Sequence, residues 1–175
     1  VTASATNVGR FIGAADFDGN GMPDLAQYGN NGAIYFNNSL PASILTGVSK
    51  PDGGAISVAY APTSNDGTSD PIVSSDDIPG VRMVVSDVTY SNGLGAARTT
   101  EYRDSGGTYD YERRASLGFT TIKKILPLAA GQTTNSVETR TFDTSSDQSA
   151  GNLLSRELAE GTTVYHKVTN EWTTV

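Results

Sequence analysis

The sequence predicts an all-β protein on three observations. Thr, Ser, Val, Tyr and Gly are abundant, and the β-branched and aromatic members of this set favour strands. Apolar residues alternate with polar ones over short runs, whereas a helix would show them at spacings of three and four. Turn dipeptides of the Asn-Gly and Asp-Gly type separate these runs, as they do in antiparallel hairpins.

The strands are expected to pair as successive hairpins after an opening run at 10–15. The paired segments are 25–28 with 33–36, 44–49 with 56–60, 81–90 with 96–102, 119–126 with 136–142, and 153–158 with 163–168. Only 151–160 would also suit a helix, and a strand agrees better with its neighbours. Because a lone hairpin is marginally stable, this repeated unit suggests part of a larger β assembly.

The stretch from about 61 to 79 breaks this pattern. It is rich in Ser, Asp, Pro and Gly and carries few large apolar side chains. Such a composition cannot bury enough surface to offset the entropy of ordering the chain. We therefore expect an acidic loop or linker there.

The composition excludes several kinds of chemistry. The chain has 19 acidic and 12 basic side chains, and the net charge of −7 disfavours binding to nucleic acid phosphates and acidic membranes. It has no cysteine and one histidine, His166, which excludes disulfides, a thiol nucleophile and Cys-based or multi-histidine metal sites. No apolar run approaches the roughly 20 residues of a membrane helix, and no signal-peptide pattern is present.

One acidic motif has the spacing of a cation site. Asp16, Asp18 and Asn20 occupy positions one, three and five of a glycine-containing loop, and Asp24 occupies position nine. Oxygen ligands at alternate positions can converge on a hard cation such as Ca²⁺, which takes six to eight of them. We assign these four side chains as ligands, with the Met22 carbonyl and water completing the shell.

The motif is not an EF-hand. An EF-hand has a bidentate Glu at position twelve and flanking helices, whereas this sequence has Gln27 at that position and a strand pattern after Pro23. A calcium loop between two strands fits better. The alternative is an acidic turn that uses Asp, Asn and Gly for their turn preferences alone. Mutual repulsion of three carboxylates favours the cation site.

Residues 11–25, with the sequence FIGAADFDGNGMPDL, resemble an FG-GAP (VCBS) repeat. This repeat is the calcium-looped blade of β-propellers of the integrin α-subunit type. The resemblance implies a propeller-type blade over residues 1–40. One blade does not close a propeller, so the remainder of a ring would lie elsewhere.

A second resemblance covers the rest of the chain. The segments 44–48, 55–60, 84–95, 100–103 and 109–119 are similar, in this order, to the shell region of insecticidal toxin complex (Tc) B components and the related SpvB-like and RHS (YD-repeat) proteins. The sequence departs from that pattern at Ala115, where the family often has Gly. The resemblance implies a β-hairpin shell segment over residues 41–175.

The family resemblance implies a bacterial protein that is secreted or displayed at the cell surface, in which hairpins form a shell around a toxin. On this hypothesis the chain is a non-enzymatic, calcium-binding structural segment. It would contact other segments of the same shell or other toxin-complex subunits. The alternatives are an extracellular module that binds a carbohydrate or protein receptor, and a hydrolase that uses two carboxylates. No nucleophile and base arrangement is apparent, so no catalytic residue is assigned.

Overall fold

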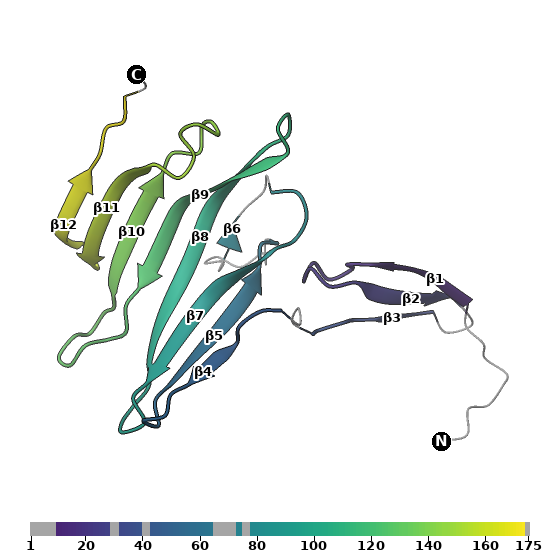
Figure 1. Ribbon diagram of the computed structural model, residues 1–175, viewed down its shortest axis with the longest axis horizontal. Coiled ribbons are helices and arrows are strands. Elements are labelled where there is room, and N and C mark those ends of the chain that lie inside the picture. The colour runs from purple at the N-terminus through teal and green to yellow at the C-terminus, as the bar shows by residue number, and fades with distance from the viewer. Residues whose placement is uncertain (1–9, 29–31, 40–42, 65–72, 75–77, 174–175) are drawn as a thin grey trace. The chain divides into compact units, whose positions relative to one another are not determined.

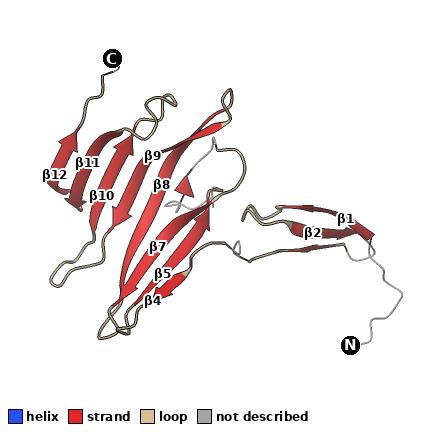
Figure 2. Ribbon diagram, in the orientation of Figure 1, coloured by secondary structure: helices blue, strands red, loops and turns tan. Residues whose placement is uncertain are grey.

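The computed structural model describes residues 10–28, 32–39, 43–64, 73–74 and 78–173. Within these residues the protein consists of strands and loops without a helix, which confirms the predicted all-β class (Figure 2). The chain divides into two compact units, Val1–Ile44 and Leu45–Val175. The boundary predicted at 40/41 and the propeller nature of the first unit stay predictions.

The first unit is a three-stranded antiparallel sheet in the order β1-β2-β3 (Figure 1). Its strands are β1 (Arg10–Ala15), β2 (Asp24–Tyr28) and β3 (Ala33–Tyr35). β2 and β3 form the first predicted hairpin, whose turn at 29–31 lies outside the described residues. Leu25, Ile34 and Tyr35 are each about half exposed, so apolar burial within the described part of this unit is small.

The second unit is one nine-stranded sheet in the order β12-β11-β10-β9-β8-β7-β5-β4, with β6 beside β8 (Figure 1). Its strands are β4 (Gly47–Ser49), β5 (Ala55–Pro62), β6 (Val73–Ser74), β7 (Met83–Ser91), β8 (Arg98–Asp110), β9 (Ala115–Ile125), β10 (Ser136–Phe142), β11 (Leu153–Glu160) and β12 (Thr163–Thr169). The remaining predicted hairpins are all present. The ambiguous segment at 151–160 contains strand β11.

The predicted strands at 96–102 and 119–126 were too short. β8 continues to Asp110 and β9 begins at Ala115, and the two pair along this whole length. The extension is rich in Thr, Ser and Gly and lacks apolar alternation, but a strand inside a sheet gains its hydrogen bonds from backbone neighbours whatever its side chains. The turn between them holds an ion pair of Asp110 and Arg113 (3.5 Å).

Most of the predicted acidic loop at 61–79 lies outside the described residues. Its described parts include the end of β5 and the short strand β6, which runs parallel to β8 with Val73 opposite Asp104. Thr63 is buried and accepts a hydrogen bond from the Arg82 backbone N–H at its Oγ1 (2.9 Å). The described parts of this stretch are therefore joined to the sheet, through the strand pairing of β5 and β6 and through the hydrogen bond between Arg82 and Thr63.

The second sheet is held together mainly by its backbone and by pairs of side chains across strands. In the part of the chain that the structure describes, the buried apolar side chains are only Ala61 and Leu117. Cross-strand partners share one face of a sheet, so the register defines rows of neighbours. One row is Tyr102, Lys124, Glu138, Leu158 and His166, and the next is Asp104, Ile122, Arg140, Arg156 and Val168.

Candidate metal centre

The acidic motif forms the loop between β1 and β2, as the sequence predicts. Ala15 and Asp24 are partners at the end of this strand pair, so the loop 16–23 closes over a narrow base. Gly19 and Gly21 have φ angles of 75° and 83°, a left-handed backbone that glycine adopts at little cost. These two residues allow the chain to turn tightly enough to bring its carboxylates together.

The three carboxylates of the motif converge. Asp16, Asp18 and Asp24 each contribute an oxygen, and these atoms lie within 4.8 Å of one another. Asp24 is completely buried, whereas Asp16 and Asp18 are exposed. The group thus has a closed inner side and an open outer side, and its oxygen donors suit a hard cation.

Asp24 is held by two backbone amides that are distant in sequence. The Phe17 N–H donates to its Oδ2 (2.8 Å), and the Asn37 N–H donates to its Oδ1 (2.7 Å). The bond from Asn37 contributes most to lowering the pKa of Asp24, and together with other backbone bonds it outweighs the opposing effect of burial. Asp24 is therefore a carboxylate that stays ionised inside the loop.

Asp16 and Asp18 accept hydrogen bonds from the loop itself. The Asn20 N–H donates to Asp16 Oδ1 (3.0 Å) and to Asp18 Oδ1 (3.1 Å), and the Gly21 N–H donates to Asp16 Oδ2 (2.9 Å). Each carboxylate oxygen has two lone pairs, so these bonds leave acceptor capacity for an ion. The residues present therefore fit a hard divalent cation.

The side chain of Asn20 forms hydrogen bonds within the protein that the motif did not predict. Its Oδ1 accepts a bond from the Met22 N–H (2.8 Å), while its Nδ2 donates to Asp18 Oδ2 (3.0 Å) and to the Asn37 carbonyl (2.9 Å). Asn20 thus links the loop to the segment after β3. The ligand roles of Asn20 and of the Met22 carbonyl stay predictions.

Asn37 is the residue that sequence reasoning missed. Its N–H holds Asp24 and its carbonyl accepts from Asn20. The register of the β2–β3 hairpin offered a signal, because Leu25 pairs with Tyr35 and this places the residues just after β3 beside Asp24. The metal spacing alone could not indicate that partner.

A second charged cluster lies on the large sheet and was also missed. Glu138 on β10 is 7% exposed and accepts hydrogen bonds from Arg140 Nε and from Arg156 Nη2 (2.9 Å). The bond from Arg156 contributes most to lowering the pKa of Glu138. Arg140 and Arg156 are direct cross-strand partners, so Glu138 offsets the repulsion between two like charges that face each other.

Asp104 lies in the neighbouring row with a different environment. Burial raises its pKa to about 6. Its cross-strand partner on β9 is the apolar Ile122, which also lines a cavity of about 150 Å³ with Tyr102, Glu138 and Phe142. The face of the sheet thus holds one carboxylate with charged partners and one beside an apolar neighbour.

The comparisons with known proteins agree on one group. A family model described as the insecticide toxin TcdB middle/N-terminal region matches residues 1–146. A chain in the crystal structure of TcdB2-TccC3-TEV superimposes with a TM-score of 0.65 at 15% sequence identity, over 84% of this chain and 10% of that chain. No curated protein matches. Within the described residues, no helix has the length and apolar character needed to cross a bilayer.

Proposed function

The chain belongs to the family of the insecticide toxin TcdB middle/N-terminal region, and we propose that it forms part of the wall of a shell that encloses a toxin. The family match over residues 1–146 is the observation that carries this proposal. The role is structural and non-enzymatic. The chain spans 10% of the structure-matched chain, so the remaining wall would come from other segments.

The architecture of the second unit supports a wall. Its hairpins join edge to edge into a single sheet from β12 to β4, and each hairpin pairs with the next as well as within itself. A sheet of this kind grows by adding hairpins at its edges, where backbone groups are available for pairing. Its small apolar core is suited to a thin layer more than to a globular body.

The proposed partners are other segments of the same shell and other toxin-complex subunits, in a bacterial protein that is secreted or displayed at the cell surface. The matched crystal structure is that of TcdB2-TccC3-TEV, in which TcdB2 is combined with TccC3. That pairing supports assembly between toxin-complex proteins. A receptor or glycan partner is the alternative, and a glycan array with the purified chain would test it.

For the first unit we propose an FG-GAP-type blade whose loop binds Ca²⁺. Asp16, Asp18, Asn20 and Asp24 would supply side-chain ligands, with the Met22 carbonyl. The convergence of three carboxylates within 4.8 Å supports this assignment. The ion would neutralise charges that otherwise repel one another, and so stabilise the loop.

Calcium binding is tested by hydrogen exchange and calorimetry on the purified chain. Addition of Ca²⁺ should slow exchange at the amides of the loop 16–23, and a chelator should reverse this, because a ligand of the folded state stabilises it. Asp18→Asn should weaken binding, whereas Asp52→Asn, in an exposed turn of the other unit, should not. Unchanged exchange and no heat of binding would contradict the calcium assignment.

The wall is tested in the complete toxin-complex protein by removing the hairpin 153–169. Loss of this hairpin should open the shell and expose the enclosed polypeptide to added protease. A deletion of equal length from an exposed loop outside the shell is the control. Continued protection of the enclosed polypeptide after removal of the hairpin would contradict the proposal.

A further inference from the structure

The central strand β8 has neighbours on its two sides over different lengths. It pairs with β7 from Arg98 to Glu101, and with β9 from Glu101 to Asp110. Each side of β8 therefore has a stretch of backbone beyond the end of its neighbouring strand. The stretch on the side of β9 is 98–100.

The chain fills one of these gaps with a short added strand. Beyond the end of the β7 ladder, β6 pairs with β8 in parallel at Asp104 and Ser105 (Figure 1). On the β9 side the ladder with β8 ends at Ile125. Both backbone groups of Leu126 are bonded elsewhere, its N–H to the Ser136 carbonyl (2.8 Å) and its carbonyl to Asn135 Nδ2 (2.8 Å), and Pro127 has no N–H to offer. Among the described residues, no strand pairs with β8 at 98–100 on the side of β9.

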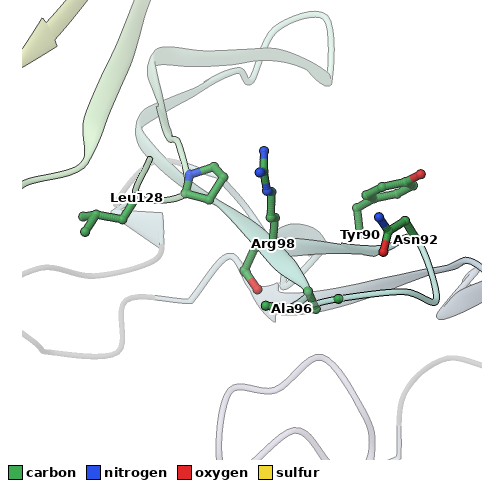
Figure 3. A pocket seen from close by; sticks show the side chains of 9 residues that line it. Tyr90, Asn92, Ala96, Arg98 and Leu128 are labelled. Atoms are coloured by element: carbon green, nitrogen blue, oxygen red, sulfur yellow. The ribbon is translucent and has the colours of Figure 1, made fainter. Parts of the chain in front are cut away.

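A cavity of about 750 Å³ lies at this second gap. It is lined by the turn before β8, by Tyr90 and Asn92, and on the far side by Pro127 and Leu128. Figure 3 shows the Arg98 side chain extending between Leu128 and Tyr90. The volume is within the roughly 300–1,000 Å³ of ligand pockets.

The charge of the cavity is positive although the chain is acidic. Arg98 is the charged side chain that lines the cavity, and among the described residues its guanidinium has no hydrogen-bonding or ion-pair partner. Lys50 lies outside the lining, with its Nζ 4.8 Å from the centroid of the Tyr90 ring. Two cations therefore lie beside Tyr90, since Arg98 is its cross-strand partner on β8. Leu128, which lines the cavity, is 53% exposed and supplies apolar surface.

We propose that this cavity binds an extended acidic segment of a partner polypeptide, which adds as a short strand to β8 at 98–100. Alternate residues of a strand direct their backbone groups to opposite sides, so this stretch offers hydrogen bonds toward the gap. A carboxylate of the incoming segment would pair with Arg98. The need for backbone hydrogen bonds selects a peptide over other anions.

The test uses a peptide of alternating valine and aspartate with fluorescein on its N-terminal amine, fluorescein-Val-Asp-Val-Asp-Val-amide, and the full chain in fluorescence anisotropy. Arg98→Glu should weaken binding by about tenfold or more, since it reverses a contacting charge. Arg98→Met, which keeps the aliphatic stem, should weaken it less. Lys123→Glu makes the same charge change on the opposite face of the sheet and should alter binding by less than about twofold.

Two further peptides separate strand addition from simple attraction of charge. A version with lysine in place of aspartate should not bind, and an N-methylated version should bind at least about tenfold more weakly because it cannot complete the backbone ladder. Circular dichroism of each variant checks that it folds. Failure of the acidic peptide to bind, equal binding of the lysine peptide, or equal binding of the N-methylated peptide would each overturn the proposal.

Discussion

Among the described residues, Asp24 in the first unit and Glu138 in the second are the most deeply buried carboxylates, and the two units stabilise them by different means. In the first unit, no arginine or lysine among the described residues forms an ion pair with Asp24. Asp24 instead accepts hydrogen bonds from the backbone N–H groups of Phe17 and Asn37. Glu138 in the second unit is held by Arg140 and Arg156. Backbone amides supply partial charge and fixed geometry, whereas guanidinium groups supply full charge on flexible side chains.

This difference indicates which role each carboxylate can have. A carboxylate that is satisfied by backbone dipoles keeps its full negative charge, so Asp24 can still contribute to binding a cation. Glu138 is already paired with two positive charges and serves to join β10 and β11. The same chemical group therefore suits an ion site in one unit and a cross-strand link in the other.

The largest effect is expected for Asp24→Asn. The new amide would present an N–H₂ group to one of the two backbone donors, so the loop would lose an acceptor at its buried centre. Exchange of the Phe17 and Asn37 amides should accelerate by about ten- to hundredfold, the equivalent of a hydrogen bond to a charged group. Hydrogen exchange followed by mass spectrometry measures this.

The second unit provides an internal control for this variant. Amides in β9 and β10 should keep their protection in Asp24→Asn, because the second unit has its own sheet. Asp52→Asn serves as a matched change in an exposed turn. Unaltered exchange at Phe17 and Asn37 would show that Asp24 does not hold the loop.

A smaller effect is expected for Glu138→Gln. The change leaves Arg140 and Arg156 facing each other without a carboxylate, but their side chains are 45% and 50% exposed and solvent screens the repulsion. The free energy of unfolding should fall by about 1–2 kcal/mol in urea titrations. Glu157→Gln, which breaks the more exposed pair with Lys167 (2.9 Å), should cost about 0.5 kcal/mol. Equal costs would contradict a special role for Glu138.

The effect expected for Asp104→Asn is smaller than that of Glu138→Gln near neutral pH, and it depends on pH. The folded pKa of about 6 is above the ordinary 3.8, so ionisation of Asp104 removes stability as pH rises through that window. Asn carries no charge, so the variant should gain about 1 kcal/mol near pH 7.5, after discounting for solvent screening, and nothing below about pH 4. Urea midpoints at both values measure this, and a gain that is independent of pH would contradict the explanation.

Glu138 and Asp24 have the opposite dependence. Their pKa values are lowered in the folded protein, so their stabilisation is complete above the ordinary values of 4.5 and 3.8 and is lost as pH falls through the folded pKa of each. Asp104 therefore changes stability between about pH 4 and 6, whereas Glu138 and Asp24 change it below their ordinary values of 4.5 and 3.8. Single variants can assign each part of the pH profile to its group.

The strand pairs of the sheet could be predicted wherever apolar alternation was flanked by turn residues. The hairpin of β11 and β12 is an example, because its alternation and the Glu160-Gly161 turn are both local signals. The second half of β8 could not be predicted in this way. This half includes Gly106 and Gly107 among Ser and Thr, so it shows no alternation of apolar and polar residues. Its strand conformation depends on backbone pairing with β9, which a local sequence pattern does not reveal.

The acidic motif at residues 16–24 was the most predictable part of the candidate site. Regular spacing identified Asp16, Asp18 and Asp24, whose carboxylates converge in the structure. Spacing gives no information about a residue that contributes only its backbone, so Asn37 was missed. The cavity beside Arg98 was also missed, because it depends on where the β8 and β9 ladders end.

The unequal ladders of β8 have a mechanical consequence. β7 is joined to β8 through four paired positions, whereas β9 is joined to it through nine. Under tension along the strands, hydrogen bonds across such joints share the load in shear, so the joint with fewer bonds fails first. A pulling force that loads β7, β8 and β9 should therefore separate β7 from β8 before it separates β8 from β9.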